Sequence, residues 1–161
     1  MKKLPWFLLS LAVIFVDQLS KHWAMSTLIP YQPTPLFPMF NFTLAYNTGA
    51  AFSFLSAAGD WHQWFFACFS VVMSIILAVW LMRLPSKAVL QCLAISLILG
   101  GALGNLYDRA VLGHVIDFIE LYYGNYRWPV FNLADSAICL GAILLLVDLF
   151  RNPKDSQPAS N

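Results

Sequence analysis

Two aspartates, Asp117 and Asp135, have the sequence surroundings that most favour acid–base chemistry. Asp117 lies inside the apolar run Val115-Ile116-Asp117-Phe118-Ile119, so loss of hydration should disfavour its charged form and raise its pKa. Asp135 follows Asn132-Leu133-Ala134 at the start of a long apolar stretch, where water is scarce. Two carboxylates that lie within hydrogen-bonding reach of each other cannot both ionise, so they share one proton. If the fold brings them together, the ionised member can activate water and the protonated member can polarise a carbonyl.

We expect several other polar residues to lie at the same depth in a membrane. Asp17 and Lys21 are four residues apart and would share a helix face, as would Asn105 with Asp108 and with Arg109. An ionisable side chain inside hydrocarbon costs about 2.5–3.5 kcal/mol on insertion scales, so each one calls for a partner or a function. For any one pair, a structural ion pair is as good an interpretation as a functional one. The whole set at one level favours a site.

The elements that must position these residues are apolar helices. Of the 161 residues, 60% are hydrophobic and only 11% are charged, which excludes an ordinary soluble domain. A helix needs about 20 residues to cross a hydrocarbon core of about 30 Å. Runs of this kind lie at about 4–23, 64–82, 88–107 and 133–150. The sequence therefore predicts an all-α membrane protein with four transmembrane helices, in a single domain covering 1–150.

The positions of lysine and arginine predict the orientation, because cytoplasmic loops near a membrane carry the positive excess. An even number of spans places both termini on one side. Six basic residues would share that side and three would lie at the other end: Lys2, Lys3, Arg83, Lys87, Arg151 and Lys154, against Lys21, Arg109 and Arg127. We therefore expect cytoplasmic termini with a disordered tail over 151–161. The segments at about 26–62 and 110–132, and with them the polar set, should be extracytoplasmic.

The two outer segments are long enough to fold outside the bilayer. Prolines at 30, 33, 35 and 38 exclude a regular helix there, and the run 40–46 (FNFTLAY) is typical of a strand that ends at the turn Asn47-Thr48-Gly49. The run 115–119 fits either a strand or a helix lying on the membrane surface. A small β-containing extracytoplasmic subdomain is the prediction.

Three other function classes compete with a hydrolytic dyad. His114, Asp117 and Glu120 recur every third residue and could bind a cation, but no HExxH motif accompanies them, so we expect no metal. Intramembrane carboxylates also serve proton-coupled transporters, yet these ones gather at one interface and the two halves show no repeat. A membrane scaffold would need neither Asp117 nor Asp135. The formal net charge of +1, without a basic cluster, gives no reason to expect nucleic-acid binding.

Five motifs in a fixed order resemble those of the bacterial lipoprotein signal peptidases, the signal peptidase II family. The resemblance covers 4–150 and departs from the family at no motif position. The motifs are Asp17-Gln18-Leu19-Ser20-Lys21, Asn47-Thr48-Gly49-Ala50-Ala51-Phe52, Gly100–Gly104 followed by Asn105-Leu106-Tyr107-Asp108-Arg109, Val115-Ile116-Asp117-Phe118-Ile119, and Phe131-Asn132-Leu133-Ala134-Asp135.

This resemblance implies an intramembrane aspartyl endopeptidase of the bacterial cytoplasmic (inner) membrane. Such an enzyme removes signal peptides from prolipoproteins, cutting before a cysteine that carries a diacylglyceryl group. It implies no cofactor, and it names prolipoproteins and membrane lipids as partners; we expect a monomer. By motif position Asp117 and Asp135 would form the catalytic dyad, and Asp17 with Lys21 would support the site. The implied substrate-binding residues are Asn47, Asn105, Arg109, Asn132 and Ala134.

Overall fold

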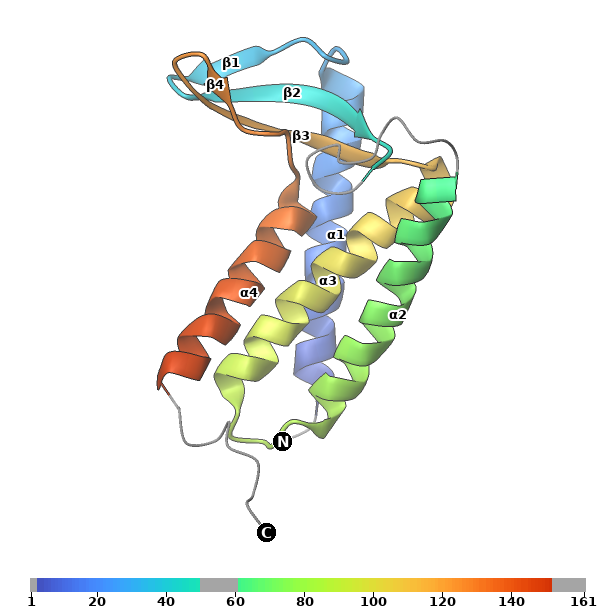
Figure 1. The fold of residues 1–161 in the computed structure, drawn as a ribbon, viewed down its shortest axis with the longest axis vertical. Helices are drawn as coiled ribbons and strands as arrows, with labels where there is room; N and C mark the ends of the chain where they lie inside the picture. The colour runs from blue at the N-terminus through green and yellow to red at the C-terminus, as the bar shows by residue number, and fades with distance from the viewer. Residues whose placement is uncertain (1–2, 50–60, 152–161) are drawn as a thin grey trace.

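A computed structural model describes residues 3–49 and 61–151, except for the side chains of 61–63. Within these residues four long helices run beside one another (Figure 1), and each is long and apolar enough to cross a membrane. They are α1 (Leu4–Thr27), α2 (Trp61–Arg83), α3 (Val89–Leu112) and α4 (Leu133–Arg151). The predicted fold class, four membrane helices with a small sheet, is confirmed.

A small antiparallel sheet lies beyond one end of the helices, opposite the α2–α3 connection (Figure 1). β2 and β3 pair from Phe40 opposite Leu121 to Asn47 opposite Val115, with a register shift between Phe42 and Ala45. The run 115–119 is therefore a strand, and the surface-helix alternative is wrong. The strands, in spatial order, are β1 (Thr34–Phe37), β2 (Phe40–Asn47), β3 (Val115–Tyr123) and β4 (Tyr126–Arg127).

The helices extend past the spans that hydropathy predicts. α1 continues to Thr27 rather than ending near 23, and α3 continues to Leu112 rather than 107. A helix need not stop where its apolar run stops. α3 ends only at Gly113, which takes the left-handed conformation (φ 78°) and whose N–H donates to the Arg109 carbonyl. The segment that connects α3 to β3 thus begins at Gly113. Of the predicted disordered tail, 151–161, Arg151 is the last residue of α4, and the rest lies outside the described residues.

Small residues let the helices approach closely around α3. A Cβ on Gly100 would lie 2.7 Å from the Val13 Cβ of α1, and a Cβ on Gly101 would collide with the Ala134 carbonyl oxygen of α4. Gly141 of α4 is in the same position toward α3, since its Cβ would lie 2.6 Å from the Ala94 carbonyl oxygen. Such contacts are the usual basis of helix association in lipid, where burying apolar surface gives no advantage.

The outward faces of the helices are apolar. Leu11 and Phe15 on α1, Phe69 on α2 and Ile143 on α4 are each more than half exposed. Exposed apolar surface of this extent on parallel helices suits contact with lipid rather than water. Polar side chains are instead turned inward, and they gather where the helices meet the sheet.

Candidate active site

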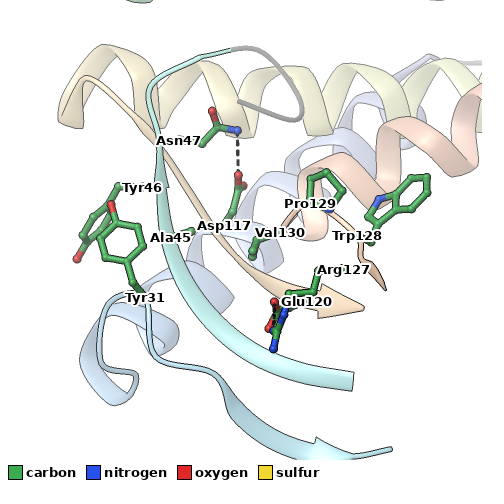
Figure 2. A pocket seen from close by; sticks show the side chains of 10 residues that line it. All are labelled: Tyr31, Ala45, Tyr46, Asn47, Asp117, Glu120, Arg127, Trp128, Pro129 and Val130. Carbon is green, nitrogen blue, oxygen red and sulfur yellow. Dashed lines mark hydrogen bonds and ion pairs between the residues drawn. The ribbon is translucent and has the colours of Figure 1, made fainter. Parts of the chain in front are cut away.

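Asp117 is presented by β3 and is nearly enclosed, with 2% of its surface exposed. Two side-chain amides hold its carboxylate. Asn47, at the end of β2, donates from Nδ2 to Oδ2 over 3.0 Å (Figure 2), and Asn132 donates from Nδ2 to Oδ1 over 2.7 Å. Asn47 and Asp117 are far apart in the sequence, so it is the pairing of β2 with β3 that brings them together.

Asp135 is held by the start of α4. Asn132 caps this helix: its Oδ1 accepts from the Asp135 N–H (2.9 Å), and the Asn132 N–H donates back to Asp135 Oδ2 (3.3 Å). This reciprocal pair is a capping box, which satisfies two N–H groups that a helix start leaves without partners. The other oxygen, Oδ1, accepts from Asn105 Nδ2 of α3 at 2.8 Å. The carboxylate is thus fixed from two directions.

Asn132 joins the two aspartates that the family resemblance implies are a dyad. Its side chain donates to Asp117 and its backbone exchanges hydrogen bonds with Asp135, so one residue lies between the carboxylates. Burial raises the pKa of Asp117, and the nearby charge of Asp135 raises it further; the amides of Asn47 and Asn132 oppose the shift, which ends at about 7. A carboxyl with such a pKa can hold or release a proton near neutral pH.

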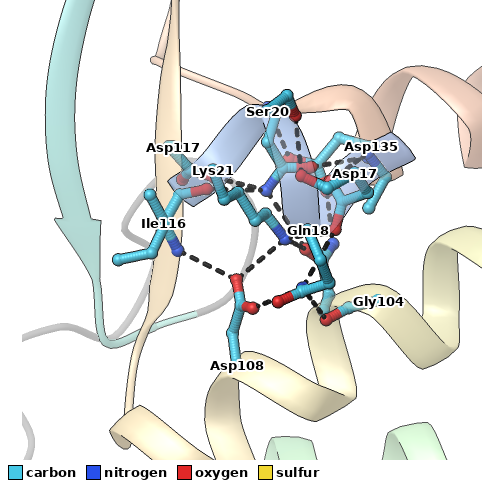
Figure 3. A network of polar contacts seen from close by, with 12 residues as sticks. Asp17, Gln18, Ser20, Lys21, Gly104, Asp108, Ile116, Asp117 and Asp135 are labelled. Atoms are coloured by element: carbon cyan, nitrogen blue, oxygen red, sulfur yellow. Dashed lines mark hydrogen bonds and ion pairs between the residues drawn. The ribbon is translucent and has the colours of Figure 1, made fainter. Parts of the chain in front are cut away.

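Lys21 lies at the centre of a buried polar network behind the aspartates (Figure 3). Its Nζ lies 2.7 Å from Asp17 Oδ2 and 2.8 Å from Asp108 Oδ2, and all three side chains are at most 1% exposed. Nζ also donates to Asn105 Oδ1 at 3.0 Å, and Asn132 Nδ2 donates to the same oxygen at 3.1 Å. With its oxygen engaged in this way, the Asn105 amide turns its NH2 toward Asp135.

The carboxylates of Asp17 and Asp108 in this network also accept hydrogen bonds from backbone N–H groups. Asp17 Oδ1 accepts from the Ala134 N–H of α4 (2.9 Å), and Asp108 Oδ2 accepts from the Ile116 N–H of β3 (3.2 Å). Asp17 and Asp108 therefore fasten the two segments that carry Asp135 and Asp117. The predicted pair Asp17–Lys21 is present. The sequence places Asp108 in the same polar set through its spacing from Asn105, but it does not predict the contact of Asp108 with Lys21.

Gln18 is a second contact that sequence reasoning missed. Its Nε2 donates to Asp108 Oδ1 at 2.8 Å and to the Gly104 carbonyl at 3.3 Å, which links α1 to α3 beside the network (Figure 3). The only signal in the sequence was its place next to Asp17. Ala134 contributes its backbone N–H and is itself fully buried.

Arg109 lies near the aspartates on α3, and its guanidinium donates to two backbone carbonyls. Its Nη2 donates to the Gly49 carbonyl (3.4 Å) and its Nη1 to the Asn105 carbonyl (3.3 Å), while the guanidinium lies 5.9 Å from the Phe66 ring centroid. Gly49 in turn donates its N–H to Asn47 Oδ1. Arg109 thus anchors the turn that carries Asn47.

His114, Asp117 and Glu120, whose spacing could suit cation ligands, have different partners in the structure. Glu120 accepts from Asn41, Thr43 and Arg127, whereas Asp117 accepts from Asn47 and Asn132. The His114 ring packs 4.9 Å from that of Tyr46. Among the residues that the structure describes, no group of three or more His, Cys, Asp or Glu side chains is arranged to hold a metal ion.

Comparison with known proteins identifies the family. The family model described as signal peptidase (SPase) II matches residues 9–151. A lipoprotein signal peptidase of Cellvibrio japonicus is 52% identical over 149 residues, covering 92% of this chain and 87% of the relative. One of Pseudomonas aeruginosa (strain UCBPP-PA14) is 51% identical over 160 residues, covering 98% and 94%. A bacterial membrane enzyme solved by the in meso method superposes with a TM-score of 0.83 at 29% identity, covering 98% and 94%. The chain therefore belongs to the signal peptidase II family.

Proposed function

We propose that this chain is an intramembrane aspartyl endopeptidase that removes signal peptides from prolipoproteins, cutting before the diacylglyceryl-modified cysteine. Membership of the signal peptidase II family supports a peptidase acting on prolipoproteins. The observation that carries the catalytic assignment is the pair Asp117 and Asp135, joined through Asn132. Asp117 is buried and lines a cavity, and Asn132 links it to Asp135 at the start of α4.

In the proposed reaction the carboxyls of Asp117 and Asp135 share one proton. The ionised aspartate removes a proton from water, whose oxygen attacks the scissile carbonyl carbon, and the protonated aspartate donates to the carbonyl oxygen. Collapse of the tetrahedral intermediate breaks the carbon–nitrogen bond as the nitrogen accepts a proton from the dyad. The raised pKa of Asp117 lets this carboxyl hold or release the shared proton near neutral pH.

The neighbouring polar residues would position this dyad. Lys21 acts through Asn105, whose amide it turns toward Asp135, and Asn132 sets the separation of the two carboxylates. Holding the reacting groups in place lowers the entropic part of the barrier. Asn47, which lines the cavity beside Asp117, and Arg109, which lies next to the turn at Gly49, are the donors we assign to a substrate backbone or to a developing negative charge.

We further propose that the protein is a monomer in the bacterial cytoplasmic membrane, with cytoplasmic termini and the dyad at the extracytoplasmic face. Lys3 donates to the Leu84 carbonyl, so the start of α1 and the end of α2 share one end of the molecule. The sheet, whose strand β3 carries Asp117, lies at the opposite end (Figure 1), and Asp135 lies in the first turn of α4. A diacylated cysteine sits at the outer leaflet boundary, so its scissile bond could reach the dyad while its acyl chains stay in lipid.

Cleavage of a diacylglyceryl-modified prolipoprotein peptide by the purified protein tests this proposal. Asp117→Asn and Asp135→Asn should each lower kcat at least about a thousandfold, because asparagine keeps the size of the side chain but cannot exchange a proton. Asp148→Asn, at the far end of α4, is the matched control and should retain activity. Substantial cleavage by either dyad variant would remove that residue from the mechanism. Proton uptake by reconstituted vesicles without any cleavage would instead favour a transporter.

A further inference from the structure

A cavity of about 360 Å³ extends from Asp117 over the sheet. Asn47 and Asp117 lie at one end, and Glu120, Arg127 and Trp128 lie at the other (Figure 2). Asp117 and Glu120 are three residues apart on β3, which at about 3.3 Å per residue is about 10 Å. The cavity is therefore long enough for a few residues of extended peptide leading away from Asp117.

The far end of the cavity has a defined charge. Glu120 is 5% exposed, and its Oε2 accepts from Asn41 Nδ2 (2.9 Å) and Thr43 Oγ1 (2.7 Å). Its Oε1 accepts from Arg127 Nη1 at 2.6 Å. Burial raises the pKa of Glu120, but these hydrogen bonds and the charge of Arg127 outweigh burial, so the pKa falls below its ordinary value. Glu120 is therefore an anion covered by protein.

Arg127, in contrast, is accessible. Its side chain is 57% exposed, and the guanidinium lies 5.8 Å from the centroid of the Tyr122 ring. Glu120 engages one nitrogen, while a guanidinium carries five N–H donors in a fixed fork. A ligand in the cavity would thus meet the positive guanidinium of Arg127, which the buried carboxylate of Glu120 holds in place.

The chemistry of a prolipoprotein limits which part of it can lie here. The signal helix and the acyl chains are apolar and belong in the bilayer beside the helices. The sheet lies beyond the helix ends (Figure 1), so a segment over it has left the membrane core. Only the polar chain that follows the lipidated cysteine suits a cavity with a charged end.

We propose that this cavity binds the first residues of the mature chain in extended form, and that Arg127, positioned by Glu120, selects for an acidic side chain there. The proposal rests on the function proposed above. The scissile bond lies at Asp117, and about 10 Å corresponds to three residues, so the residue facing Arg127 is the third, counting the lipidated cysteine as the first. Trp128 forms the wall beside that position.

The test compares lipidated peptides that differ only after the cysteine. One series carries Glu, Gln or Lys as the third residue, and a further peptide ends at the second residue. For the native protein kcat/KM should be about fivefold higher with Glu than with Lys, mainly through KM, because a partly exposed charge pair contributes up to about 1 kcal/mol. The truncated peptide should be cut more slowly than the Gln peptide, since it leaves the cavity unfilled.

Arg127→Gln should abolish the preference for Glu over Lys, and Lys87→Gln, an exposed substitution in the α2–α3 connection, should preserve it. Thermal unfolding in detergent would show that both variants fold. Equal kcat/KM across the native series, or an unchanged preference in Arg127→Gln, would overturn the cavity assignment while leaving the proposed function standing. Failure to cut any lipidated peptide would overturn the proposed function and this inference with it.

Discussion

At the scale of single residues, Asn132 shows how much of the site depends on an amide rather than on an acid. Its Nδ2 donates to Asp117, to Asn105 and to the Ile116 carbonyl, and its Oδ1 accepts from the Asp135 N–H. These contacts reach α3, α4 and β3. No isosteric carboxylate could replace it, because the donors toward Asp117 would be lost.

The sequence pointed to the members of this site but not to their contacts. Asp117 and Asp135 could be singled out because each stands in apolar surroundings, which is a local property of the chain. The orientation of Asn105 depends on Lys21, which lies 84 residues away, and no local pattern predicts it. The Glu120–Arg127 pair forms across the β3–β4 hairpin and could not be foreseen while 115–119 remained open between strand and helix.

The pKa of Asp117 gives a first prediction, on stability. Because folding raises this pKa from 3.8 to about 7, the native state favours the neutral carboxyl. The stabilisation is fully present below pH 4 and is lost as the pH rises through 7. Asp117→Asn is neutral throughout, so relative to the native protein it should gain stability between pH 4 and 8, by roughly 4 kcal/mol at most. Thermal unfolding of both proteins in detergent measures this, and a pH-independent difference would contradict it.

At the scale of elements, the hydropathy of the chain predicts which segments are helices better than it predicts where they end. Each predicted span matches its helix to within about a residue at the end away from the sheet, but α1 and α3 continue past the apolar run at the sheet end. In α3 this extension carries Asp108, which is polar yet only 1% exposed. Hydropathy registers polarity and not the direction of a side chain, so it ends the span too early.

The contact between α3 and α4 gives a second prediction. Gly101→Ala would place a methyl group against the Ala134 carbonyl oxygen, so α4 must shift, and with it Asp135. We expect a loss of about 1–3 kcal/mol in stability, the usual cost of overpacking, and a lower kcat. Ala142→Val adds more volume on an exposed position of α4 and is the matched control. An unchanged melting temperature of Gly101→Ala in detergent would show that α3 and α4 can move apart at this contact without loss of stability.

At the scale of the whole molecule, the arrangement of charge along the helices predicts a topology. Reporters fused near Lys87 or after Phe150 should read cytoplasmic, and insertions near Ser56 or Asn125 should read extracytoplasmic. Asn125 lies in the turn between β3 and β4, so this site reports on the side that carries the sheet. Inverted readings at two or more sites would place the dyad at the wrong face for a lipidated precursor.

The position of the dyad where helices meet sheet gives the last prediction, that lipid is part of the recognised substrate. A peptide with the cleavage sequence but without the diacylglyceryl group should be cut far more slowly than the lipidated form. Each buried methylene contributes about 0.8 kcal/mol to partitioning, so part of any difference would only reflect concentration at the membrane. The comparison therefore belongs in mixed micelles at matched surface concentration, with the unmodified peptide held there by its own signal helix. Equal kcat/KM for the two forms would mean that Asp117 and Asp135 serve a general signal-helix protease. A large remaining difference would mean that the site itself reads the lipid, and that binding energy from the acyl chains is used to hold the scissile carbonyl at the dyad.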